Sequence, residues 1–433
     1  MKFIRQKIRK LFHLLLKITA SRVIKRYRPV VVGVTGSVGK TTAKEAIFSV
    51  LSRKFWVRKN EENYNNEVGV PLAVLGVKPI SPQNKKGDFL LSLLKSAWLA
   101  YGWPEQAYPR LLILELAADR PGDIEYLSKI INPKIGVVTA VGDVPVHVEF
   151  YASPEAVAKE KSKLVAALPP DGLAVLNYDD QAVLDMKEKT SAKKITFGFS
   201  NSADLWASDT SYFAAEESLS DGVANQNIGG LSFKINSGST FVPMRANNLV
   251  AIHQIYGILA AAAVGLHFGM NLVDISGAIE NIDLPHRRMN LLRGVKNSVV
   301  IDDTYNASPL STHAALDTLR DFTKARQTIG KNGRRIAVLG DMRELGKYEA
   351  NAHRAIGNLA AERCDILVTV GGAGKLIADS AGNQMPKENI ISFDTSEEAK
   401  IRVQEIIREG DVVLVKGSRA MKMEKIVEEI AAA

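Results

Sequence analysis

The clearest chemical signal in this 433-residue chain is a pair of glycines, the second followed directly by a lysine and two threonines, at positions 36–42. A β-branched run, Val30–Val34, is followed by Thr-Gly-Ser-Val-Gly-Lys-Thr-Thr at positions 35–42. Glycines allow backbone N–H groups to close around phosphate oxygens, and the N-terminus of a following helix adds a favourable dipole. We therefore predict that the chain binds ATP, with Lys40 neutralising the phosphates and the Thr41 hydroxyl holding Mg²⁺. The predicted nucleotide-binding residues of this loop are Gly36, Ser37, Gly39, Lys40, Thr41 and Thr42.

Polar residues also follow other apolar runs. Glu115 ends the run Leu111–Glu115, and a carboxylate at the end of a strand beside a phosphate loop is suited to Mg²⁺. His147 lies after another strand-like run and is a candidate second metal ligand, although a lone histidine among apolar residues is more often structural. The segment 301–309 offers acids, a tyrosine and an asparagine that could bind a ribose and a base. A glycine turn at 416–419 adds cations suited to phosphate or carboxylate.

The composition is that of an ordinary globular protein. Hydrophobic residues make up 46% of the chain and charged residues 24%, and the length predicts two or three domains. The one cysteine, Cys364, excludes a disulfide framework and a four-cysteine zinc module. Its isolation suits a reducing cytosol, so we expect a cytoplasmic protein, and we expect a monomer.

The net charge of +9 is concentrated at the start of the chain. Residues 1–30 contain ten Lys or Arg and no acid, which leaves 46 basic and 47 acidic residues elsewhere. This balance argues against a nucleic-acid-binding surface. Within residues 1–28, which we predict to form a basic amphipathic helix, apolar residues recur at helical spacing: Phe3, Ile4, Ile8, Leu11, Leu15 and Ile18. The segment is too short and too broken to span a bilayer, and two alternatives stay open: peripheral contact with the inner, anionic face of a membrane, or packing on the protein itself.

The order of elements predicts an α/β fold. Strand-like runs at 111–116, 135–141 and 172–176 alternate with helical patterns at 44–51 and 155–168. Residues 200–245 are rich in Ser, Asn and Gly and predict a small antiparallel or loop-rich insert. A second alternation begins near residue 287. We therefore predict a P-loop central domain with a mostly parallel sheet at 29–286, and a Rossmann-like α/β domain at 287–433.

Ten segments together resemble the Mur ligases, the ATP-dependent amide ligases of cell-wall peptide synthesis. Within that family the chain is most similar to members that add D-alanyl-D-alanine to a UDP-muramoyl tripeptide. The matching segments are TGSVGKTT (35–42), NYNNEVGVPL (63–72), LELAADRPGDI (114–124), VPVHVEF (144–150), AKEKSKLVAAL (158–168), LNYDD (176–180), HRRM (286–289), IDDTYNASP (301–309), VLGDMRELG (338–346) and VLVKGSRAMKME (413–424).

The resemblance implies an ADP-forming reaction that uses ATP and Mg²⁺. A carboxylate of a cell-wall peptide precursor attacks the γ-phosphate, and D-Ala-D-Ala or a similar amine then displaces phosphate from the acyl phosphate. It further implies that Thr41, Glu115, His147 and a carbamylated Lys161 bind metal. The implied catalytic residues are Lys40, Lys161, His147 and Asn66, with Asn65 nearby, and the implied nucleotide contacts outside the loop are Arg288, Asp303 and Tyr305.

The chain departs from the family pattern in three places. About thirty residues precede the first strand, so we expect the usual N-terminal UDP-binding domain to be missing. His253-Gln254 with Gly257 replaces a His-Asn…Asn pattern, and Ala117 replaces a glycine after Glu115. Two other functions remain alternatives: a folylpolyglutamate or poly-amino-acid synthetase-like ligase, and a non-catalytic nucleotide-binding scaffold.

Overall fold

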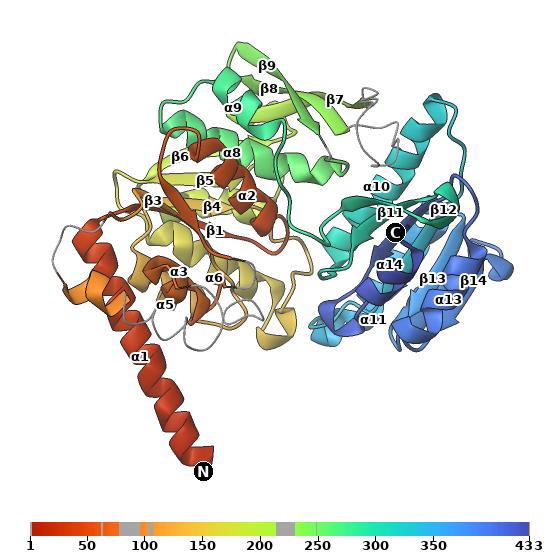
Figure 1. The fold of residues 1–433 in the computed structure, drawn as a ribbon, viewed down its shortest axis with the longest axis horizontal. Helices are drawn as coiled ribbons and strands as arrows, with labels where there is room; N and C mark the ends of the chain where they lie inside the picture. The colour runs from red at the N-terminus through yellow and green to blue at the C-terminus, as the bar shows by residue number, and fades with distance from the viewer. Residues whose placement is uncertain are drawn as a thin grey trace. The chain divides into compact units, whose positions relative to one another are not determined.

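The computed structural model describes residues 2–61, 64–77, 96–102, 107–213, 230–247 and 249–432, and for residues 2–10 the backbone alone. The chain forms two compact units (Figure 1). The first comprises Met1–Val141, Glu155–Trp206 and Tyr256–Ala278, and the second comprises Gly142–Pro154, Ala207–Ile255 and Ile279–Ala433. Asn63 of the family-like segment 63–72 and residues 214–229 of the predicted insert lie outside the described residues.

A parallel sheet forms the centre of the first unit. Its hydrogen-bonded order is β2-β3-β1-β4-β5-β6, followed by the start of β7. The strands are β1 (Val30–Thr35), β2 (Val57–Lys59), β3 (Leu111–Glu115), β4 (Ile135–Val138), β5 (Leu173–Asn177), β6 (Lys193–Gly198) and β7 (Leu205–Phe213). Val34 pairs with Glu115 and Thr35 with Val138, so β1, β3 and β4 end at one edge of the sheet. The predicted α/β class with a mostly parallel sheet is confirmed.

Helices cover both faces of this sheet (Figure 1). On one face lie α2 (Lys40–Leu51), α8 (Ile255–His267) and α9 (Leu272–Ile279). On the other lie α1 (Lys2–Tyr27), α3 (Gly69–Leu75), α5 (Asp123–Ile131) and α6 (Pro154–Ala166). The short elements α7 (Gln181–Leu184) and η2 (Asp185–Lys189) follow β5. Every residue of β3, β4 and β5 is buried, as expected for parallel strands between two layers of helices.

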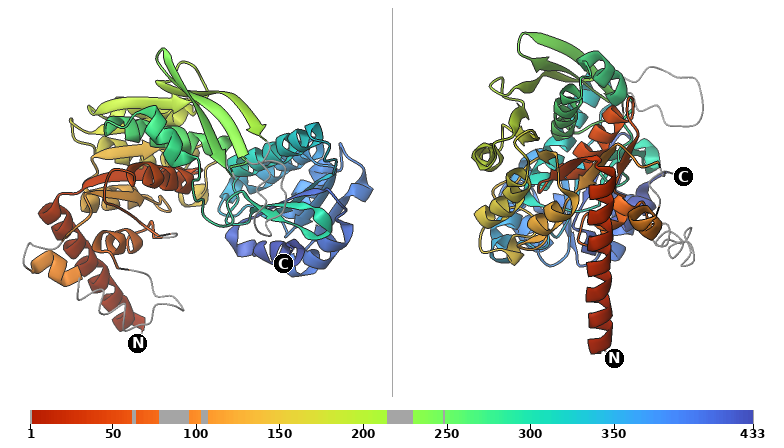
Figure 2. Two further views of the ribbon diagram at one scale, coloured as in Figure 1. Left: turned by 45° about the horizontal axis from the view of Figure 1, so that its top comes forward. Right: turned by 90° about the vertical axis from the view of Figure 1, so that its left-hand side faces the viewer.

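The long helix α1 packs on the first unit with only part of its length. Leu16, Ala20, Val23 and Ile24 are buried in one cluster with residues of α3 and α5. Figure 2 shows the first turns of α1 extending away from α3 and α5. Among the described residues, no helix combines the length and the hydropathy that crossing a bilayer would require.

The second unit contains another mainly parallel sheet in the order β10-β11-β15-β12-β13-β14, in which β10 alone pairs antiparallel. Its strands are β10 (Asn290–Arg293), β11 (Val299–Asp303), β12 (Arg335–Gly340), β13 (Ile366–Val370), β14 (Ile390–Phe393) and β15 (Val412–Lys416). Its helices include α10 (Pro309–Thr328), α11 (Glu349–Arg363), α12 (Gly374–Ala381), α13 (Ser396–Ile406) and α14 (Glu424–Ile430). Short 3₁₀ turns complete the unit: η1 (Val148–Phe150), η3 (Ile252–Gln254), η4 (Val295–Asn297), η5 (Gly346–Tyr348), η6 (Lys387–Asn389) and η7 (Arg419–Met421).

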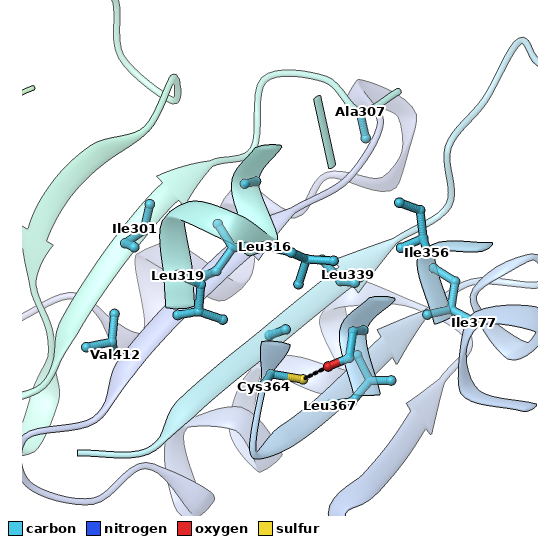
Figure 3. Packing of buried hydrophobic residues seen from close by; sticks show 14 of the residues in the cluster. Ile301, Ala307, Leu316, Leu319, Leu339, Ile356, Cys364, Leu367, Ile377 and Val412 are labelled. Carbon is cyan, nitrogen blue, oxygen red and sulfur yellow. Dashed lines mark hydrogen bonds between the residues drawn. The ribbon is translucent and has the colours of Figure 1, made fainter. Parts of the chain in front are cut away.

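An antiparallel hairpin of β8 (Gly230–Ser237) and β9 (Thr240–Asn247) also belongs to the second unit, within the segment where the sequence predicts an antiparallel insert. The core beneath α10 joins Ile301, Leu316 and Leu339 (Figure 3). Cys364 lies in the same core, where its thiol donates to the Ala360 carbonyl at 3.1 Å. Burial raises the pKa of this thiol to about 12, so the cysteine acts as a small apolar residue.

Candidate active site

The phosphate loop lies between the end of β1 and the start of α2. Gly36 has a φ of +150° and Gly39 a φ of +82°, backbone conformations that residues other than glycine rarely adopt. A Cβ at Gly36 would lie 2.1 Å from the Thr139 hydroxyl oxygen. The loop is fixed from β4, because Ser37 N donates to Ala140 O at 2.5 Å and Thr139 Oγ1 donates to Val38 O at 2.6 Å.

Two lysines point at the same backbone carbonyl of this loop. Lys40 Nζ donates to Gly36 O at 2.9 Å and to Ser37 O at 3.3 Å, and Lys161 Nζ donates to Gly36 O at 3.0 Å. The side-chain oxygen of Ser37 is buried without a hydrogen-bond partner in the described part of the chain. The ammonium of Lys40, the second N–H donor of Lys161 and the Ser37 hydroxyl surround a glycine cradle, and this arrangement fits an anionic group such as a nucleotide phosphate.

Lys161 is the buried lysine of α6. The residue is 2% exposed, whereas Lys159 is exposed and Lys163 pairs with Glu160 at 2.8 Å. Burial, assisted by the charge of Lys40, lowers the pKa of the Lys161 amine to about 7, against opposing contributions from Asp119 and Glu160. An amine with this pKa is substantially uncharged near neutrality, which is the state that can act as a nucleophile.

Glu115 connects the end of β3 to the loop helix. Thr41 Oγ1 donates to Glu115 Oε2 at 2.9 Å, and Asn65 Nδ2 donates to Glu115 Oε1 at 3.1 Å. Asn60 holds the backbone of Glu115 on both sides, donating to its carbonyl at 3.0 Å and accepting from its N–H at 2.9 Å. These hydrogen bonds fix the position of the Glu115 carboxylate beside Thr41 at the start of α2.

The donor set fits Mg²⁺ of the kind that accompanies a nucleotide. A hydroxyl and a carboxylate are hard oxygen ligands, and Mg²⁺ is usually bound by one or two carboxylates together with substrate phosphates. Among the described side chains, no group of three or more His, Cys, Asp and Glu is arranged to hold a metal ion. Thr41 and Glu115 therefore suit an ion whose remaining ligands come from phosphate and water.

Two further predicted residues have structural partners. Asn66 Oδ1 accepts from Gly69 N at 2.9 Å and from Val68 N at 3.2 Å, at the start of α3. His147 belongs to the second unit, has a φ of +65°, and places Nδ1 2.5 Å from Glu344 Oε2. The hydrogen bond from His147 lowers the pKa of the Glu344 carboxyl group. The catalytic and metal-binding roles predicted for Asn66 and His147 remain predictions.

The predicted nucleotide contacts Arg288, Asp303 and Tyr305 also lie in the second unit. The guanidinium of Arg288 stacks 3.9 Å from the centre of the Tyr305 ring. Asp303 forms a buried ion pair with Lys416, whose ammonium also donates to Asn306 O at 3.0 Å. These contacts build a flat cationic surface beside a fixed carboxylate, an arrangement that suits the base and ribose of a nucleotide.

Several residues around these groups carried no sequence signal of their own. Asn60 lies 55 residues from Glu115, and Glu344 lies far along the chain from His147. Glu344 falls in the family-like segment 338–346, so a positional comparison with family members could have identified it. For Asn60, only the pairing of β2 with β3 brings the side chain to its partner.

The fold and the loop define a class: an α/β protein with a phosphate loop at the edge of a parallel sheet. Comparison with known proteins makes the assignment specific. Residues 104–265 match the Mur ligase middle domain, and residues 287–419 match the Mur ligase, glutamate ligase domain. The chain belongs to the Mur ligase family and is an ATP-dependent, ADP-forming ligase of that type.

Individual relatives and structures agree with this assignment. The UDP-N-acetylmuramoyl-tripeptide–D-alanyl-D-alanine ligase of Mycobacterium leprae is 32% identical over 410 residues, covering 90% of this chain and 71% of that protein. The Bacillus subtilis ligase of the same name is 28% identical over 403 residues, covering 92% and 75%. A crystal structure of MurF from Acinetobacter baumannii matches with a TM-score of 0.72 and 25% identity, covering 96% and 80%. The MurF ligase of Thermotoga maritima in complex with ADP matches in fold, with a TM-score of 0.73, 23% identity and coverage of 96% and 83%.

Proposed function

We propose that this ligase joins D-Ala-D-Ala, or a similar amine, to the terminal carboxylate of a cell-wall peptide precursor. The carboxylate oxygen attacks the γ-phosphorus of ATP, the bond to the bridging oxygen breaks, and ADP leaves. The amine then attacks the acyl carbon, phosphate leaves, and the nitrogen loses a proton. The observation that carries the ATP-dependent step of this proposal is the convergence of Lys40, Lys161, Thr41 and Glu115 on one phosphate loop.

The residues of the loop would act mainly by positioning and by neutralising charge, as phosphoryl transfer requires. Lys40 exchanges its bonds to the loop carbonyls for phosphate oxygens. Thr41 and Glu115 would hold Mg²⁺, which supplies Lewis-acid polarisation of the phosphates when it is bound. Arg288, Asp303 and Tyr305 would bind the base and ribose.

Lys161 is proposed to act as a carbamate. An ammonium beside Lys40 would repel a metal ion, whereas a carbamate is an anionic oxygen ligand. The uncharged amine favoured by burial is the form that adds CO₂. The proposal is supported by the position of the Lys161 amine, which donates to Gly36 O of the loop and does not lie on the solvent-exposed side of α6.

The amine and the precursor are proposed from the relatives named D-alanyl-D-alanine ligases, which cover most of this chain. We also propose that the protein works on the cytoplasmic side, where ATP is found. The same loop chemistry would serve a ligase that adds glutamate, so the experiment must compare amines.

The test is ADP formation by the purified full chain with ATP, Mg²⁺ and UDP-muramoyl tripeptide, in the presence of D-Ala-D-Ala, D-Ala or L-Glu. We expect ADP release that depends on D-Ala-D-Ala and a product whose mass increases by that dipeptide minus water. Preference for L-Glu would favour the synthetase-like alternative. ATP binding without turnover of any amine would favour the scaffold alternative.

A further inference from the structure

The helix α1 has two apolar faces, and the unit covers one of them. Leu16, Ala20, Val23 and Ile24 are between 0% and 6% exposed and pack with α3 and α5. Lys17 lies 4.8 Å above the Tyr126 ring of α5, and Tyr27 stacks on Tyr108 with ring centres 4.7 Å apart. This face anchors the helix as part of the first unit.

The other face is an exposed apolar stripe, formed by Leu11, Leu14, Leu15 and Ile18. These side chains are 56%, 51%, 54% and 47% exposed. Their spacing of three and four residues places them on one side of a helix, opposite Leu16 and Ala20. Soluble surfaces rarely leave such an apolar group uncovered, and larger exposed apolar patches mark sites of interaction with proteins or membranes.

Exposed aromatic residues lie beside the same helix. Residues 96–101 are helical, and Trp98 and Tyr101 are 54% and 56% exposed. Arg22 of α1 connects the two helices, because its Nε donates to Ala100 O at 3.2 Å and its guanidinium lies 4.6 Å from the Tyr101 ring centre. Tryptophan and tyrosine favour the headgroup region of membranes, where an apolar ring and a polar tip are both satisfied.

The charge of the N-terminal segment favours one partner for the stripe. Residues 1–30 contain ten Lys or Arg and no acid, although the rest of the chain is nearly neutral. Pairing two copies of this helix would set basic residues against basic residues, whereas an anionic lipid surface complements them. A basic helix with an apolar face lies in the plane of the interface and does not need to span the bilayer.

We propose that α1 docks the protein peripherally on a membrane that contains anionic lipids, with Leu11, Leu14, Leu15 and Ile18 entering the interface. Tyr101 lies against Arg22 of the same helix, four residues beyond Ile18, and Trp98 is exposed on the helical segment that contains Tyr101. The proposal depends on the first unit alone and stands whether or not the ligase reaction is assigned correctly. Because the opposite face of α1 is packed, removing the whole helix would expose the core, so point substitutions are the appropriate test.

The experiment is flotation of the full chain with vesicles of phosphatidylcholine alone and of phosphatidylcholine mixed with phosphatidylglycerol. We expect binding to the mixed vesicles that weakens at high salt. Replacing Leu11, Leu14 and Leu15 together by Gln, which keeps helix propensity, should reduce partitioning by at least about a hundred-fold. Replacing Arg5, Lys7 and Arg9 together by Gln should reduce it by roughly a hundred-fold on mixed vesicles, at about 1 kcal/mol per charge and 1.4 kcal/mol per tenfold.

A matched control removes exposed apolar side chains elsewhere. Val273 on α9 and Ile401 on α13 are 68% and 48% exposed, and Val273→Gln with Ile401→Gln should leave vesicle binding unchanged. All variants should keep the wild-type circular dichroism spectrum. Tryptophan emission should shift to the blue on vesicle binding, and Trp98→Phe should remove most of the shift.

Three results would overturn the proposal. The first is no flotation with mixed vesicles. The second is equal flotation of the wild type and the triple Leu→Gln variant. The third is self-association in sedimentation velocity, without lipid binding, that the Leu→Gln variant abolishes; the occupant of the stripe would then be a second copy of this chain.

Discussion

Leu15 and Leu16 are neighbours in sequence and lie on opposite faces of α1. Leu15 is 54% exposed in the apolar stripe, and Leu16 is 3% exposed in the cluster with α3 and α5. Truncating each to Ala makes the same chemical change in the same helix, so the difference in helix propensity cancels between the two variants. The pair therefore separates packing on the protein from contact with a membrane.

The two substitutions should differ in their effect on stability. A buried Leu→Ala change costs about 2–5 kcal/mol. We expect about 2–3 kcal/mol for Leu16→Ala, because Leu16 lies at the border of the cluster, next to the exposed Leu14 and Leu15. At about 2–4 °C per kcal/mol for a domain of this size, Leu16→Ala should lower the melting temperature by roughly 5–10 °C. Leu15→Ala should change the free energy of unfolding by less than about 0.5 kcal/mol.

The assay combines differential scanning calorimetry with vesicle flotation. Leu16→Ala should lower the melting temperature without loss of vesicle binding at a temperature where the variant is folded. Leu15→Ala should weaken vesicle binding and leave the melting temperature unchanged. Equal shifts in melting temperature would refute the packing of α1 described here, since one face could not then be buried and the other exposed.

The remaining predictions concern the phosphate loop and the His147–Glu344 pair. Lys40→Ala should abolish ADP formation, because the cation that neutralises the phosphates is lost, whereas Lys159→Ala on the exposed side of α6 should remain active. Lys161→Ala should be inactive at any bicarbonate concentration and partly rescued by a short carboxylic acid; an inactive Lys159→Ala beside an active Lys161→Ala would contradict this choice of lysine. Glu344 has a lowered pKa through His147, so this pair stabilises the protein above the ordinary carboxyl pKa and the contribution is lost as pH falls through the lowered value. Urea titrations across pH should therefore show His147→Ala less stable than wild type near neutrality and equal to it in acid; a constant difference would count against the pair.

Local patterns predicted the fold class and the loop, because both depend on residues close in sequence. The β-branched run and the Gly-Lys-Thr spacing predicted a strand, a turn and a helix. In the structure the strand is β1 at 30–35, the helix is α2 at 40–51, and the turn lies between them. The resemblance to the Mur ligases is confirmed by relatives that cover most of the chain. The roles assigned to individual site residues remain predictions.

It was harder to predict which face of the N-terminal helix packs on the protein. The sequence left α1 either packed on the protein or facing a membrane, because apolar residues at helical spacing are compatible with both. The structure buries Leu16 and Ala20 and exposes Leu11, Leu15 and Ile18, so packing holds for one face and the other is uncovered. Pairs such as Asp303 with Lys416 are separated by 113 positions and arise only when β11 and β15 become neighbours.

The connection between α1 and β1 is short, and this has a mechanical consequence. The helix ends at Tyr27 and the strand begins at Val30, so Arg28 and Pro29 alone join them. Arg28 N still donates to Ile24 O at 2.9 Å, and the proline ring restricts φ at the second position. The helix and the strand that leads into the phosphate loop therefore cannot swivel independently. A protein held at a surface by α1 would no longer tumble freely and would present its nucleotide loop at one fixed orientation to that surface. A ligand that is also held at the surface would then reach the loop by diffusion in two dimensions.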